Sequence, residues 1–434
     1  MVLAEIASLS TSELTGFFLV IAVLLLSAHF FGHLFQQIRL PRVIGEIAGG
    51  FVLGPTISGY FLPPLCDWLF LNRAVPIVYS IGLVLLMFVS GFDVKKSFNR
   101  EDKKIVTAIL AGSTAIPFFA GWSITSLYDC SKLIGRADNK LAFQIVFAIA
   151  VAVTSIPVIT KIFLDLDLTK SRFAKIVLGT AIIHDAVLYV ALSIATGMVG
   201  AKNQSPFSLC VTVAMTFIFF AGALAVLPKF LQKVNNLRAN LLFKSSATGY
   251  SLFICFLFAA VASLFNINIV FGAFIAGIIV GIMPERRFAD SRSIIKEFSL
   301  ACFVPCYFAI LGLKLDLIHK FDPRSFIWFL IFSSAVQFTG TILGAKAVKM
   351  SWLSSVNFAM VMNARGGPGI VLASIAFDLG IISESFFTTL VLAAILTSLL
   401  AGSWLRLVLS KGWELLSDPD ISICPEEAFE LRRF

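Results

Sequence analysis

Long apolar runs separated by short basic gaps fill most of this chain of 434 residues. A helix that crosses the hydrocarbon core of a bilayer needs about 20 mainly apolar residues, and in lipid a continuous run of that length must be helical to satisfy its backbone polar groups. The sequence therefore predicts an all-α membrane protein with about thirteen transmembrane helices. The expected spans are residues 14–38, 43–62, 75–92, 104–128, 142–164, 172–198, 208–228, 247–264, 267–283, 296–314, 324–345, 355–377 and 386–407.

The composition excludes a water-soluble or nucleic-acid-binding protein. Charged residues make up 14% of the chain, against about 25% in soluble domains. The net charge is +9, but its Lys and Arg residues lie in the gaps between apolar runs and form no basic face. Seven cysteines and four histidines show no metal-ligand spacing, and His29 and His33 have no third ligand nearby in the sequence. We expect no metal and no cofactor.

The basic residues also predict the orientation in the membrane. With thirteen spans, the gaps on one side hold 25 Lys and Arg residues and those on the other side hold 8, while Arg365 lies within a span. Cytoplasmic loops carry the excess of Lys and Arg in membrane proteins. We therefore expect the N-terminus outside and a short cytoplasmic tail at 410–434, after a transmembrane domain at 1–409.

Three features of the first half of the chain recur in the same order in the second half and predict an internal inverted repeat. The matched spans are seven apart, an odd number, so the two halves have opposite orientations in the membrane. Inverted repeats with broken helices are the architecture of many secondary transporters, whereas glycines alone could simply allow close helix packing. The matches are Gly45, Gly50 and Gly54 with Gly272, Gly277 and Gly281, segment 88–93 with segment 309–314, and Pro157 with Pro368.

Two of the predicted spans contain residues that break a helix. Pro157 lacks a backbone N–H and clashes with the preceding turn, so Thr154 and Ser155 are expected to supply oxygen ligands to a small, hard cation; a simple proline kink is the alternative. The second break is expected at Gly366, Gly367 and Pro368, because glycine and proline disfavour a regular helix. Asn363 and Arg365 precede it directly.

Asp185 is the acidic residue expected at mid-span. A carboxylate there costs at least about 2.5 kcal/mol on insertion scales, so a functional role is the default interpretation. Apolar surroundings favour the protonated carboxyl, which lets a proton and a cation compete for it. The alternatives are an ion pair with Arg365 and, for the neighbouring His184, plain packing. Arg365 could instead compensate the partial charges of helix ends.

These residues together resemble the cation:proton antiporter-2 (sodium/hydrogen exchanger) family. The resemblance runs from about residue 38 to 407. It is carried by Leu40 to Pro55, Phe88 to Asp93, Thr154 to Ile162, His184-Asp185, Gly272 to Gly281, Met362 to Gly366 and Asp378 to Gly380.

The resemblance implies an elevator-type sodium/proton antiporter fold, a homodimer and a bacterial-type inner membrane. Spans 14–92 and 247–314 would form the dimer panel, spans 104–198 and 324–407 the moving core with two crossing broken helices, and span 208–228 the linker. Asp185 would bind the ion and the proton, with Thr154, Ser155 and Asn363 near the helix crossing, and the neighbouring His184 is a further candidate ligand.

The predicted function is therefore exchange of Na⁺ or K⁺ for H⁺, 1:1 through Asp185. Two departures from the family pattern support this stoichiometry: His184 stands where many relatives have a second acidic residue, and Thr341 aligns where some have a Lys. An Arg365-centred carrier of an anion or organic solute is the alternative. The chain has neither the HExxH metal motif nor the GxSxG nucleophile elbow, so no enzyme is predicted.

Overall fold

The computed structural model describes residues 10–37, 40–72, 74–92, 102–169, 171–200, 241–265, 267–318 and 320–416, with residues 214 and 222. Within these ranges the chain is helical, and the β-structure is a single bridge between Ile134 and Ile382. Eight of the described helices are long and apolar enough to cross a membrane, and a bent helix pair makes a ninth. The predicted span 208–228 and residues 417–434 of the tail lie outside the described residues.

Every other predicted span coincides with a helix or a consecutive pair of helices. The helices are α1 (Thr11–Gln37), α2 (Arg42–Leu53), α3 (Ser58–Phe61), α4 (Pro63–Leu71), α5 (Ala74–Phe92), α6 (Lys103–Leu127), α7 (Lys140–Ala152), α8 (Ile156–Asp165), α9 (Arg172–Gly200), α12 (Leu241–Ser245), α13 (Ala247–Leu264), α14 (Ile269–Ile282), α15 (Glu285–Ala301), α16 (Phe303–Leu313), α17 (Pro323–Ala347), α18 (Trp352–Met362), α19 (Gly366–Asp378) and α20 (Glu384–Ser410).

Two spans differ from the predicted single helices. The predicted span 43–62 is interrupted after Leu53, where Gly54 and Pro55 end α2, because proline cannot continue the hydrogen-bond ladder. The predicted span 296–314 is divided at Cys302 into α15 and α16, and α15 begins well before the apolar run. Helix α4 was not predicted.

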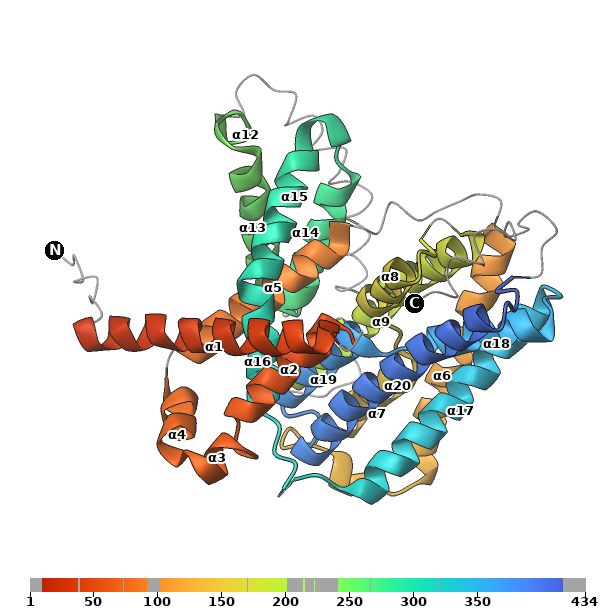
Figure 1. Cartoon of the computed structure of the whole chain (residues 1–434), viewed down its shortest axis with the longest axis horizontal. Coiled ribbons are helices and arrows are strands. Elements are labelled where there is room, and N and C mark those ends of the chain that lie inside the picture. The colour runs from red at the N-terminus through yellow and green to blue at the C-terminus, as the bar shows by residue number, and fades with distance from the viewer. Residues whose placement is uncertain are drawn as a thin grey trace.

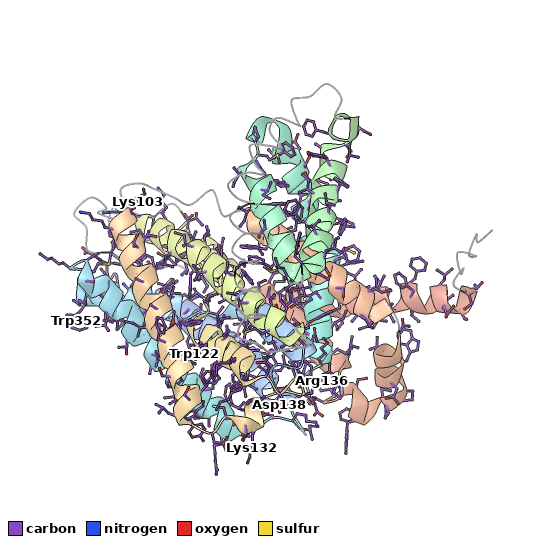
Figure 2. The ribbon with its side chains drawn as sticks, turned by 180° about the vertical axis from the view of Figure 1, so that it is seen from behind. Lys103, Trp122, Lys132, Arg136, Asp138 and Trp352 are labelled. Carbon is purple, nitrogen blue, oxygen red and sulfur yellow. The ribbon has the colours of Figure 1, made fainter. Side chains whose placement is uncertain are left out.

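The helices pack in two groups, one at the left and top of Figure 1 and the other at its right. The first group contains α1, α2, α5 and α13–α16, and the second contains α6–α9 and α17–α20. Figure 2 shows the second group from behind, with Lys103 at the start of α6 and Lys132 in the connection that follows its other end. Within the first group, α2 packs on α16 and α14 packs on α5.

The matched glycines of α2 and α14 make matched contacts. A Cβ atom on Gly50 would overlap the carbonyl of Ala309 in α16, and one on Gly277 would overlap the carbonyl of Phe88 in α5. Phe88 and Ala309 are the first residues of segments 88–93 and 309–314, which the predicted internal repeat also pairs. Helix packing in the first group thus has the two-fold correspondence that the predicted repeat requires.

Candidate ion-binding site

The first broken span consists of α7 and α8. Helix α7 ends at Ala152 and α8 begins at Ile156, so Thr154 and Ser155 lie between the two half-helices. Pro157 is the second residue of α8, not part of the gap, because a proline in the first turn sacrifices no helical hydrogen bond. The Thr154 hydroxyl donates to the carbonyl of Met362, 2.7 Å away.

The second broken span consists of α18 and α19, which are bent by 41°. Helix α18 ends at Met362, and the residues that leave the helix are 363–365. Gly366, Gly367 and Pro368 were predicted to form the break, but they are the first three residues of α19. Ser155 Oγ accepts a hydrogen bond from the Gly367 N–H at 3.1 Å, so each break binds the other.

Arg365 fills the space between the two breaks and is 2% exposed. Its Nη1 donates to Ser333 Oγ at 2.7 Å. Its Nη2 donates to the carbonyl of Val151, in the last turn of α7, and to Asn363 Oδ1, both at 3.3 Å. None of these described hydrogen bonds is to Asp185. The guanidinium also lies 5.8 Å from the ring centroid of Phe329.

Asp185 lies on α9 and is 5% exposed. Its Oδ1 is buried and has no hydrogen-bond partner among the described residues. The residue lines a cavity in which about 10 Å³ is open to the centre of a water molecule, which is room for about one water-sized species. An unsatisfied buried carboxylate oxygen is costly and is suited to binding a proton or a cation. The cavity is lined by Val153, Asp185, Leu188, Tyr189, Pro368 and Leu372.

The other predicted ligands do not line this cavity. Thr154 and Ser155 hydrogen-bond to the opposite broken span, whereas the amide of Asn363 donates to Ser334 Oγ of α17 at 3.3 Å. His184 is fully buried, and neither of its ring nitrogens has a partner among the described residues. Asp185 and Pro368 are thus the predicted site residues that the structure brings together at the cavity.

Several polar side chains that hold the breaks were not predicted. The amide of Gln337 in α17 donates to the carbonyl of Met362, the last residue of α18, at 3.3 Å. The N–H groups of Arg365 and Gly366 donate to Thr397 and Ser398 of α20. No local sequence pattern distinguishes these hydroxyl residues from those that bond only to the backbone of their own helix.

The sodium/hydrogen exchanger transmembrane family model matches residues 20–411. The chain belongs to the sodium/hydrogen exchanger family. The match covers both broken spans, the Asp185 cavity and both helix groups. Because this family consists of transporters, the chain is an integral membrane protein, in agreement with its apolar helices.

Curated relatives of the family are named as cation/proton antiporters. K(+)/H(+) antiporter 1 of Saccharomyces cerevisiae is 28% identical over 92% of this chain. The chain spans 47% of that relative, about half of its length. Na(+)/H(+)-K(+) antiporter GerN of Bacillus cereus is 24% identical, and the match covers 90% of this chain and 95% of GerN.

A solved structure shares the fold. The sodium proton antiporter MjNhaP1 from Methanocaldococcus jannaschii matches with a TM-score of 0.66 and 16% identity. The superposition covers 91% of this chain and 98% of that one. The two proteins therefore share a fold over nearly their whole length.

Proposed function

We propose that this protein exchanges Na⁺ or K⁺ for H⁺ and that Asp185 carries either the cation or the proton. The observation that carries the proposal is the buried carboxylate of Asp185, which lines a water-sized cavity beside both broken spans and whose Oδ1 has no hydrogen-bond partner among the described residues. The relatives are named as Na⁺/H⁺ and K⁺/H⁺ antiporters, which supports both cations as substrates. Thr154, Ser155, Asn363 and His184 would shape the site around the carboxylate.

The alternating-access step would be a movement of the second helix group against the first. The second group, the core, holds both broken spans and the residues that line the Asp185 cavity. The first group would be the panel at which two copies form a homodimer. The cavity lies close to the boundary between the groups, because the ring of Tyr189 packs on that of Phe274 in α14 at 5.0 Å. A small movement would thus change which side of the membrane reaches Asp185.

An Arg365-centred carrier of an anion or organic solute has less support. Such a carrier needs a guanidinium that can reach its substrate. Both Nη atoms of Arg365 already donate to protein oxygens, and the side chain is 2% exposed. Arg365 is better suited to compensating the helix ends at the crossing.

The proposed function is tested by collapsing a pH gradient in proteoliposomes with Na⁺, K⁺ or choline. We expect Na⁺ or K⁺, but not choline, to drive proton flux, and we expect Asp185→Asn to abolish it because an amide cannot ionise. Asp102→Asn is the matched control. Asp102 is also buried, but its Oδ1 lies 2.8 Å from Arg172 Nη2 in an ion pair, and it does not line the cavity. Robust exchange by Asp185→Asn would exclude Asp185 as the site.

Two further measurements test the single shared carboxylate. A higher cation concentration should move the pH of half-maximal exchange downward, because the cation and the proton compete. A 1:1 exchange moves no net charge, so an imposed membrane potential should leave the rate nearly unchanged. If a cycle moved one net charge across the membrane, its free energy would change by about 2.3 kcal/mol per 100 mV of membrane potential. A strong dependence of the exchange rate on potential would therefore contradict the 1:1 stoichiometry.

A further inference from the structure

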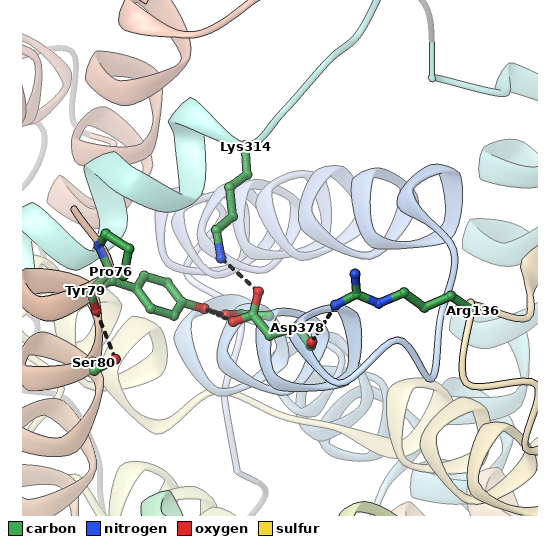
Figure 3. Close-up of polar contacts among 7 residues, drawn as sticks. Pro76, Tyr79, Ser80, Arg136, Lys314 and Asp378 are labelled. Atoms are coloured by element: carbon green, nitrogen blue, oxygen red, sulfur yellow. Dashed lines mark hydrogen bonds and ion pairs between the residues drawn. The ribbon is translucent and has the colours of Figure 1, made fainter. Parts of the chain in front are cut away.

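A cluster of polar side chains joins the two helix groups at the end of α19. The Asp378 carboxylate belongs to the second group, and both of its oxygens bind residues of the first group (Figure 3). Lys314 Nζ, at the end of α16, lies 2.7 Å from Asp378 Oδ1. The Tyr79 hydroxyl of α5 donates to Oδ2 at 2.6 Å.

Tyr79 makes this cluster more than a single ion pair. The Lys314 ammonium lies 4.0 Å from the centroid of the Tyr79 ring, a cation–π contact. The Tyr79 hydroxyl also contacts Ser374 Oγ, one turn before Asp378, and its ring packs against that of Tyr307 at 5.1 Å. Two residues of α19 are thus bound to one buried side chain of the opposite group.

The second group fixes Asp378 from its other side. Arg136, in the connection between α6 and α7, donates to the backbone carbonyl of Asp378 at 3.3 Å (Figure 3). The backbone of Asp378 is therefore held by its own group while its carboxylate is held by the other. A movement of one group against the other would have to separate Asp378 from Lys314 and Tyr79.

The cluster and the Asp185 cavity share helix α19. Pro368 and Leu372 of α19 line the cavity, and Ser374 and Asp378 follow within the next two turns. The contacts of Tyr79 and Lys314 therefore close the boundary between the groups on the side of the cavity toward Arg136. The positive-inside rule assigns this side to the exterior.

We propose that Lys314, Asp378 and Tyr79 form a latch that closes the outer side of the Asp185 cavity and opens in each transport cycle. The proposal rests on the alternating-access function proposed above. Lys314 and Asp378 keep 24% and 35% of their side-chain surfaces exposed. Water can therefore solvate both charges as they separate, and an ion pair with such access is weak enough to break reversibly.

The test measures how fast a membrane-impermeant thiol reagent, applied from outside, reaches a cysteine introduced by Leu372→Cys. Leu372 is 3% exposed, so we expect slow labelling while the latch is intact. Lys314→Ala and Asp378→Asn should each raise the labelling rate at least several-fold. Leu188→Cys, which replaces another 3% exposed cavity residue, is the second reporter in case the first variant folds poorly.

Lys320→Ala is the matched control. Lys320 pairs with Glu384 at 3.5 Å and is 51% exposed, so its loss should leave labelling unchanged. The charge-exchange variant Lys314→Asp with Asp378→Lys should restore slow labelling. Single variants that label at the parent rate would overturn the latch, and so would fast labelling that persists in the exchange variant.

The readout also separates the latch from the proposed function. Labelling requires no transport, so it reports on the latch even if the protein exchanges no cation. If exchange depends on Asp185 while Lys314→Ala leaves labelling unchanged, the antiport function stands and the latch fails.

Discussion

Arg365 is a buried cation whose described hydrogen bonds reach a hydroxyl, an amide and a backbone carbonyl. The carbonyl is that of Val151, in the last turn of α7, where helix carbonyls have no partner within the helix. We propose that the positive guanidinium compensates the negative end of α7. None of its described hydrogen bonds is to Asp185, so we favour this role over the ion pair that the sequence also suggested.

Arg365→Ala should destabilise the protein. It would remove three described hydrogen bonds and leave the buried Val151 carbonyl and Ser333 hydroxyl without their donor. At roughly 1–3 kcal/mol for each of these two unsatisfied buried groups, we expect a loss of about 2–6 kcal/mol. The measurement is the thermal unfolding midpoint in detergent. Arg365→Lys, which keeps the charge, should be intermediate, and a midpoint for Arg365→Ala equal to that of the parent would contradict this role.

The sequence predicted some site residues much better than others. Asp185 was identifiable because a carboxylate within an apolar run is rare and costly. The roles of Ser333, Thr397 and Ser398 were not identifiable from the sequence, because hydroxyl residues are common in membrane helices and can bond to the backbone of their own helix. Their contacts at the breaks depend on how α17 and α20 pack against α19, which no local pattern encodes.

At the scale of elements, glycine and proline located both breaks to within a few residues. Pro157 and Pro368 lie in the first turns of α8 and α19, so each marks where a half-helix begins. The intervening residues carry no such signal: Thr154 and Arg365 are compatible with a helix and leave it because the opposite broken span binds their side chains.

Gly50 and Gly277 give a prediction for helix packing. A methyl group at either position would overlap a backbone carbonyl of the facing helix, and overpacking of this kind costs about 1–3 kcal/mol. Gly50→Ala and Gly277→Ala should therefore lower the thermal unfolding midpoint, and to similar extents because their contacts correspond. Gly402→Ala is the control, because its methyl group would meet Ile162 at an ordinary 3.6 Å and alanine favours the helix.

Either of two results would contradict this packing prediction. One is a Gly50→Ala or Gly277→Ala protein as stable as the parent. The other is an equal loss of stability in Gly402→Ala, which would show that any glycine replacement in these helices is harmful regardless of the space around it.

At the scale of the whole molecule, the sequence predicted helices better than their arrangement. The division into two groups follows from long-range contacts, such as α2 with α16 and α6 with α17. The repeat in the glycine positions anticipated the contacts of α2 and α14, because close approach restricts those positions to small residues. The cross-group contacts of Asp378 could not be predicted, since they depend on how the two groups face each other.

The two ends of α6 test the orientation of the molecule in the membrane. Helix α6 has 25 residues, about 38 Å at 1.5 Å per residue, which exceeds the roughly 30 Å hydrocarbon core. Lys103, the first residue of α6, and Lys132, in the connection after its last residue, are both exposed and lie toward opposite ends of the helix (Figure 2). The charge distribution of 25 against 8 assigns Lys103 to the cytoplasm and Lys132 to the exterior.

In intact cells, an impermeant thiol reagent should therefore label Lys132→Cys, and it should label Lys103→Cys only after permeabilisation. Both variants replace an exposed lysine by the same residue, so they differ in the side of the membrane and little else. The native Cys424, in the tail, should behave like Lys103→Cys. The reverse labelling pattern would mean that the molecule has the opposite orientation in the membrane and that the Lys314–Asp378 latch lies on the cytoplasmic side. Labelling of both variants without permeabilisation would mean that α6 does not cross the bilayer.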